Sequence, residues 1–346
     1  GASNVAVGQG ALDANTTANA NTAIGARTLT ANTTGANNTA VGKDALYTNT
    51  GSGDNSAVGF QALYTNAGAR NTALGHNALF NNTTADNNVA VGKSALENNT
   101  TGTQNVAVGT YALDANTTAN NNTAMGYAAM TTSTTGASNT GIGASALNSL
   151  TTASHNTAVG SDAGKSVTTG DYNTAIGTIA LDACTTGSRN VAIGYGAAKS
   201  ATTTIKNVAI GMDSLNSMVT GDGYNTVVGN AASYSNTTGS YNVSLGASAM
   251  YANTTGASNV AVGYQALDAN TTGGTNTAIG ASALTDNTTG SNNVAVGENA
   301  LANNTTASEN TACGQNALLT NTTGSSNVAV GHDALRLNTT GINHVA

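Results

Sequence analysis

Histidine and cysteine are the side chains of this sequence that could bind a metal ion or act as nucleophiles. The four histidines, His76, His155, His332 and His344, fall at different repeat positions or in distant coils, so no two are placed to share one ion. Cys184 and Cys313 lie more than seven repeats of the unit described below apart, which is beyond the reach of a disulfide. These residues therefore predict neither a metal site nor a disulfide.

Acidic residues and glycines give no sign of a catalytic or cofactor site. The 16 Asp and Glu residues, such as Asp44 and Asp114, are scattered over variable positions. The GGxGxD signature of a calcium-binding β-roll is absent, and so is the GxxxxGK[ST] spacing of a phosphate-binding loop. No Ser, His and Asp grouping stands out. We therefore predict that the chain is not an enzyme and binds no cofactor.

Tyrosines and Asn-Thr-Thr segments are the remaining candidates for recognition. Tyr47, Tyr64, Tyr234 and Tyr251 share one repeat position and could contact surface glycans through their amphipathic rings. The alternative is that these rings pack against neighbouring repeats. Asn-Thr-Thr occurs twelve times and satisfies the N-x-[ST] glycosylation pattern, but we favour the structural explanation, a turn with stacked side chains.

All of these residues are carried by one repeated unit, N-[TV]-A-[VI]-G-x-x-A-L-x-x-N-T-T-G-x-x, whose positions we number 1 to 17. The unit begins at Asn4, Asn21 and Asn38 and continues to Asn327, at intervals of 17 residues except for one of 16 and one of 18. A fixed period predicts stacked repeats, so residues 1–346 form one continuous array. Its central coils, about 133–233, are irregular and suggest a bend, a contact site or sequence drift.

The unit itself predicts an all-β fold. Positions 2 to 4 are a short β-branched run that ends at an invariant Gly, which is typical of a strand. Seventeen residues are too few for a helical repeat, which needs roughly 33. We expect a parallel β-solenoid of about 20 coils, each with two short strands and two turns, stabilised by stacking. The residues expected to stack are Asn4, Asn21, Asn38, Asn259 and Asn276 at position 1, Gly8, Gly25, Gly42 and Gly263 at position 5, and Leu12, Leu46, Leu267 and Leu284 at position 9.

The predicted strand is nonpolar on both faces, because positions 2 and 4 share one face and the Ala at position 3 lies on the other. We expect the Val or Ile of position 4, where Cys313 stands, to be buried. Small Ala residues permit close approach, so we expect another copy of the chain as a second layer. A thin sheet with a solvated Ala face is the alternative.

Composition excludes two classes of partner. Charged residues are 7% of the chain and the net charge is −7. The nine Lys and Arg residues do not cluster into a stripe that would bind nucleic acid. No apolar run approaches the ~20 residues that span a bilayer. The chain begins with Gly1 and lacks a signal-peptide core, as expected for a processed product or a piece of a longer protein.

The segments NTAIGASAL (276–284) and NVAVGKSAL (88–96) resemble the head repeats of YadA-like trimeric autotransporter adhesins. The full NTAVG…AL…NTTG unit resembles the repeat arrays of bacteriophage tail-fibre proteins. The resemblance implies a left-handed parallel β-roll, three chains side by side, and surface attachment outside the cell, on a virion tail or a bacterial surface. The unit here is a few residues longer, and no coiled-coil stalk, neck, membrane anchor or terminal chaperone domain is visible.

The leading hypothesis is therefore a homotrimeric fibre shaft that binds a cell-surface glycan or receptor by multivalent contact. The alternative is an extracellular filament or matrix protein that polymerises by end-to-end stacking of solenoid ends. An ice-binding solenoid with regular Thr is less favoured. The consecutive Thr residues at positions 13 and 14 would point to opposite faces of an extended chain, and Thr alternates with Val at position 2.

Overall fold

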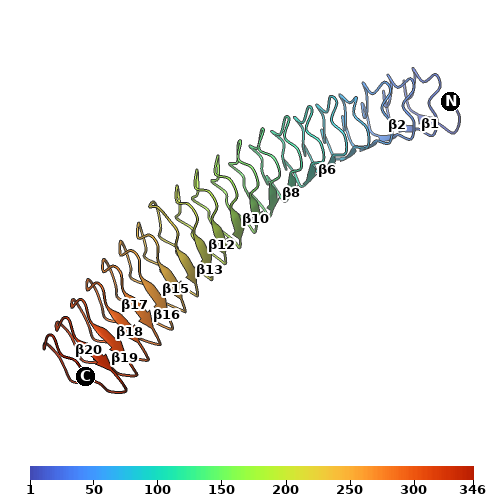
Figure 1. Ribbon diagram of the computed structural model, residues 1–346. Coiled ribbons are helices and arrows are strands. Elements are labelled where there is room, and N and C mark those ends of the chain that lie inside the picture. The colour runs from blue at the N-terminus through green and yellow to red at the C-terminus, as the bar shows by residue number, and fades with distance from the viewer. The chain divides into compact units, whose positions relative to one another are not determined.

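The computed structural model describes residues 1–346, which divide into two compact units, residues 1–171 and 172–346. In each unit, every repeat forms one coil of a parallel β-solenoid, and the chain contains no helix. Figure 1 shows the coils, each with its strand and its turns. The predicted fold class is confirmed at this level.

Each coil has a single strand of three residues at repeat positions 2 to 4. In the first unit the strands are β1 (Val5–Val7), β2 (Thr22–Ile24), β3 (Thr39–Val41), β4 (Ser56–Val58), β5 (Thr72–Leu74), β6 (Val89–Val91), β7 (Val106–Val108), β8 (Thr123–Met125), β9 (Thr140–Ile142) and β10 (Thr157–Val159). In the second unit they are β11 (Thr174–Ile176), β12 (Val191–Ile193), β13 (Val208–Ile210), β14 (Thr226–Val228), β15 (Val243–Leu245), β16 (Val260–Val262), β17 (Thr277–Ile279), β18 (Val294–Val296), β19 (Thr311–Cys313) and β20 (Val328–Val330).

The prediction of two strands per coil is wrong, because the second half of the coil is built from turns. Positions 7, 9 and 17 adopt positive φ in coil after coil, as at Asp44 (61°), Leu46 (51°) and Asp54 (60°). A residue with left-handed backbone cannot continue a strand. The turns still bond from coil to coil, since the Leu29 amide donates to the Ala45 carbonyl at 3.0 Å.

Within each unit, consecutive strands pair in parallel and the same repeat positions face one another. Thr22 pairs with Thr39, for example, and Ala23 with Ala40. The coils of irregular length keep this register, because Ser56 pairs with Thr72 and Val208 with Thr226. The missing and the additional residue are therefore absorbed in the turn before position 1, as expected for a loop.

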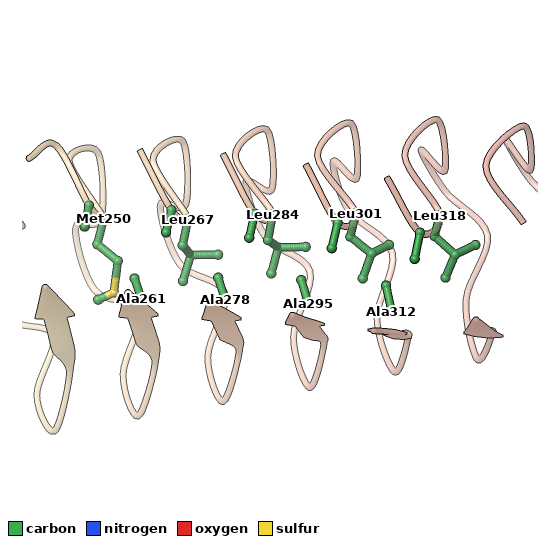
Figure 2. Packing of buried hydrophobic residues seen from close by; sticks show 14 of the residues in the cluster. Met250, Ala261, Leu267, Ala278, Leu284, Ala295, Leu301, Ala312 and Leu318 are labelled. Carbon is green, nitrogen blue, oxygen red and sulfur yellow. The ribbon is translucent and has the colours of Figure 1, made fainter. Parts of the chain in front are cut away.

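The strand presents Ala to the interior of the coil, and this corrects the predicted orientation. Ala278 and Leu284 are fully buried, whereas Ile279 at position 4 is 40% exposed and Cys313 is also exposed. Figure 2 shows position-9 side chains pointing toward position-3 Ala residues, as for Leu267 and Ala278. Where Leu at position 9 fills the interior, only a small residue fits at position 3. Val227 is the one large residue buried at position 3, in the coil that carries Ser233 in place of Leu at position 9. The Ala face is therefore not available to a second copy of the chain.

Candidate functional site

The position-1 asparagines form a hydrogen-bonded ladder along each unit. The Asn21 Oδ1 atom accepts from the Asn38 amide at 2.9 Å, and its Nδ2 donates to the Gly35 carbonyl at 2.9 Å. Asn259 does the same with Asn276 and Gly273, both at 2.9 Å. Asn4, in the first coil, accepts from the Asn21 amide at 2.8 Å. Each side chain thus joins two coils and closes the turn of its own coil.

A second ladder runs through position 12 and bears on the glycosylation pattern. The Asn287 Nδ2 donates to Asn270 Oδ1 at 3.0 Å and to the Gly290 carbonyl at 2.9 Å. Outside the first and last coils, the asparagines of Asn-Thr-Thr are buried in this way. A glycan on such a nitrogen would require the coil to open. In the central coils the ladder is replaced by buried residues, namely Ser133, Leu150, Val167, Cys184, Ala201 and Met218.

The position-5 glycines need both a positive φ and close backbone approach. Gly42 has a φ of 131°, and a Cβ atom there would lie 2.5 Å from the Gly59 carbonyl oxygen. Gly8, Gly25 and Gly263 have φ values of 132°, 138° and 136°. At position 9, Leu46, Leu267 and Leu284 are fully buried, while Leu12 in the first coil is half-buried. These residues hold the fold, and the buried Leu side chains offer no surface to a ligand.

The position-10 tyrosines stack on one another from coil to coil. The Tyr47 and Tyr64 ring centroids are 5.2 Å apart, and Tyr64 lies 5.0 Å from Phe80. Tyr234 and Tyr251 are 5.3 Å apart. The facing ring surfaces within each stack are therefore covered by another ring, which leaves the outer faces at the ends of a stack, the edges and the hydroxyls for a glycan.

The structure brings no chemically reactive groups together. Neither unit encloses a pocket, and no group of three His, Cys, Asp or Glu side chains lies together. Both cysteines are free, and burial raises the pKa of the Cys184 thiol to about 11. No helix is present that could cross a membrane.

The feature that the sequence prediction missed is the outward face of the sheet, formed by positions 2 and 4. This outward face carries Val, Ile, Leu, Met or Cys at position 4 and Thr, Val or Ser at position 2 in every repeat. Alternation showed that these two positions share a face, but not that the face points away from the core.

Comparison of the chain with models of protein families finds no match, and comparison with curated proteins finds none either.

Proposed function

We propose that the chain is the shaft of an attachment fibre, in which three copies pack side by side through the outward face. The supporting observation is the exposure of large apolar side chains along this face: Val5, Val7, Ile24, Val58, Leu74, Met125, Ile142, Ile176, Val228, Ile279, Val294, Val328 and Val330. Soluble monomers rarely expose so many large apolar side chains on one sheet face, as each unit does here. A second copy of the same regular face would cover it.

Charge supports the same proposal. No Lys, Arg, Asp or Glu occurs at position 2 or 4 of any repeat, whereas the variable positions of the turns carry nearly all the charges. Depletion of charge is characteristic of the buried centre of a protein interface. The number of three copies comes from the resemblance to trimeric adhesins, and the extracellular location on a virion tail or bacterial surface comes from the same resemblance.

Attachment through a shaft needs no pocket. Coils spaced ~4.8 Å apart present the same variable positions again and again, so weak contacts with a surface glycan or receptor add up through effective concentration. In this proposal the variable residues of the turns contact the glycan or receptor, and the outward face contacts the other copies of the chain.

Sedimentation of the purified chain at several concentrations tests the assembly. We expect three times the 33.7 kDa mass of the chain, unchanged on dilution. Ile279→Lys with Val296→Lys places charges on the outward face and should give a monomer, whereas Thr289→Lys with Thr306→Lys, on the exposed position 14, should leave the trimer intact. A monomeric wild type contradicts the proposal, and growth with concentration favours the filament.

Cys313 provides a direct test of the face that is shared. It lies in β19 on the outward face, while Cys184 is buried. In a side-by-side trimer the three Cys313 thiols face the common axis, so a short bismaleimide should link chains in the wild type and not in Cys313→Ser. A trimer that cannot be linked through Cys313 would show that the copies meet elsewhere.

A further inference from the structure

Most Lys and Arg side chains of this chain either form a salt bridge with an acidic residue or lie over an aromatic ring with no other cation beside them. The salt bridges are Arg27–Asp44 at 2.8 Å, Arg70–Asp86 at 3.2 Å, Lys165–Asp162 at 3.2 Å and Arg336–Asp333 at 3.7 Å. Lys43 lies over the Phe60 ring, and Lys93 lies over the Tyr111 ring. None of these six cations has a second cation at the same repeat position of an adjoining coil.

Arg189 and Lys206 break this pattern. They are the two cations of the chain that occupy the same repeat position, position 17, in consecutive coils. Neither takes part in a salt bridge. Like charges one strand spacing apart, ~4.8 Å, repel each other. Such a pair is disfavoured in the isolated shaft, and a bound anion would relieve the repulsion.

Tyrosines flank the pair on both sides. Tyr172, Arg189, Lys206, Tyr224 and Tyr241 each precede the position-1 Asn of the next coil, and we call this set the basic aromatic column. The Arg189 guanidinium lies 6.0 Å from the Tyr172 ring centroid. The Lys206 Nζ lies 4.6 Å from the Tyr224 ring centroid and donates to the Tyr224 hydroxyl at 2.6 Å. Each cation is thereby positioned by a ring and not neutralised by it.

Tyr241 ends the column with an open ring face. Its ring stacks on Tyr224 at 5.1 Å, with 9° between the planes, and is 54% exposed. The next residue along the column is Ser258, whose side chain is too small to cover the other face of the ring. A sugar ring can lie against such a face through its apolar C–H groups.

We propose that the basic aromatic column binds an acidic polysaccharide lying along the shaft. Carboxylate or sulfate groups would pair with Arg189 and Lys206, and a sugar ring would stack on Tyr241. The column spans four coil spacings, ~19 Å, so the ligand is a chain of several sugars. The site would give the fibre its attachment specificity, and it therefore rests on the proposed function.

Nucleic acid fits the column less well. Two cations release few counterions from a phosphate backbone, the net charge of the chain is −7, and Asp222 stands two residues before Tyr224. A polysaccharide with sparse acidic groups needs fewer cations and gains from the tyrosines.

Titration of the full-length chain with polygalacturonate tests the site. We expect Arg189→Gln with Lys206→Gln to weaken binding about tenfold or more, and Tyr241→Ala to weaken it severalfold. Lys43→Gln with Lys93→Gln is the matched charge control, and Tyr264→Ala at an exposed position 6 is the ring control. Both controls should bind as the wild type does, and neutral dextran should not bind.

Wild-type affinity in the Arg189→Gln, Lys206→Gln variant would overturn the proposal, as would absence of polygalacturonate binding by the wild type. Tighter binding of an oligothymidylate than of polygalacturonate would assign the column to nucleic acid instead. Sedimentation of the same samples separates the two proposals. A trimer without polygalacturonate binding contradicts the site alone, whereas a monomer that binds contradicts the assembly alone.

Discussion

The side-chain amide of the position-1 asparagine uses a donor and an acceptor at once, and this explains why no other residue replaces it between Asn4 and Asn327. Aspartate has the same shape, but when ionised it cannot donate to the position-15 carbonyl, and serine is too short to reach it. At Asn21, for example, the oxygen accepts at 2.9 Å and the nitrogen donates at 2.9 Å within a buried site.

Asn259→Asp should therefore destabilise the chain by about 2–4 kcal/mol at neutral pH, because a charge is buried and the Gly273 carbonyl loses a donor. Chemical denaturation measures the effect. Asn303→Asp makes the same change at an exposed position 11 and should cost less than about 0.5 kcal/mol. Equal losses in the two variants would mean that overall charge, and not the ladder, is responsible.

Gly42 and Gly51 lie in one coil and should respond oppositely to alanine. Gly42→Ala would place a methyl group 2.5 Å from the Gly59 carbonyl oxygen at a φ of 131°, and we expect a loss of about 3 kcal/mol. At Gly51 the nearest atom to an added Cβ is Oγ1 of the exposed Thr34 side chain, at 3.2 Å. Gly51→Ala should be neutral or stabilise by up to about 1 kcal/mol. Thermal melts of the two variants compare them directly, and a tolerated Gly42→Ala would disprove the close approach.

Cys184 should make the stability of its coil depend on pH in the alkaline range. Burial raises the pKa of its thiol from 9.0 to about 11. Between these values the unfolded chain binds fewer protons than the folded chain, so stability falls as pH rises. Cys184→Val should remove up to about 2–3 kcal/mol of this loss at pH 11. Denaturation curves of both proteins from pH 8 to 11 test it, and parallel curves would show that the thiol does not contribute.

At the scale of the coil, the inner and outer positions of the strand have different size limits. Ala278 is fully buried against the Leu layer, while its neighbour Thr277 points outward. Ala278→Val should overpack the interior and cost about 1–3 kcal/mol, whereas Thr277→Val adds the residue that many other repeats carry and should be neutral. Denaturation midpoints distinguish the two, and the reverse order would place position 3 outside the coil.

Much of the coil could be predicted from the sequence. The period, the strand at positions 2 to 4 and the need for Gly at position 5 follow from residue types that recur at fixed spacing. The inside of the strand could not be assigned, because Ala278 and Ile279 are both apolar and alternation alone does not show which one is buried. Size decides it, once Leu284 is known to occupy the interior.

The turns were less predictable for a related reason. Positions 7 and 9 adopt left-handed backbone with ordinary residues such as Ser282 (53°) and Leu284 (54°). Glycine is the usual signal for positive φ, and here it is mostly missing. Hydrogen bonds to the adjacent coil hold the conformation, as between the Leu284 amide and the Ala300 carbonyl at 2.9 Å. The basic aromatic column was likewise hidden, since Arg189 and Lys206 are 17 residues apart and become neighbours only when coils stack.

At the scale of the whole molecule, each strand within a unit contacts only the strands of the adjoining coils, so coils should be interchangeable units. Stability in such an array is a sum of repeat and interface contributions. Deleting residues 276–292 removes one full repeat. Each repeat position then still lies beside the same repeat position of the adjoining coil. Asn304 would bond to Asn270 as it now bonds to Asn287, and Val294 would pair with Val260. The change should cost about 1–3 kcal/mol, the share of 17 residues at ordinary stability per residue.

Deleting residues 276–283 instead joins position 17 to position 9 and removes one strand and its asparagine. The shortened coil cannot supply a position-1 Oδ1 acceptor to the Asn293 N–H or a strand to β18, so the coils on both sides lose the hydrogen bonds of this strand and ladder. We expect a loss several times larger than that of the longer deletion, measured by circular dichroism and denaturation of both variants. A chain that tolerates the half-repeat deletion better than the full-repeat deletion would show that its stability does not come from stacking in register.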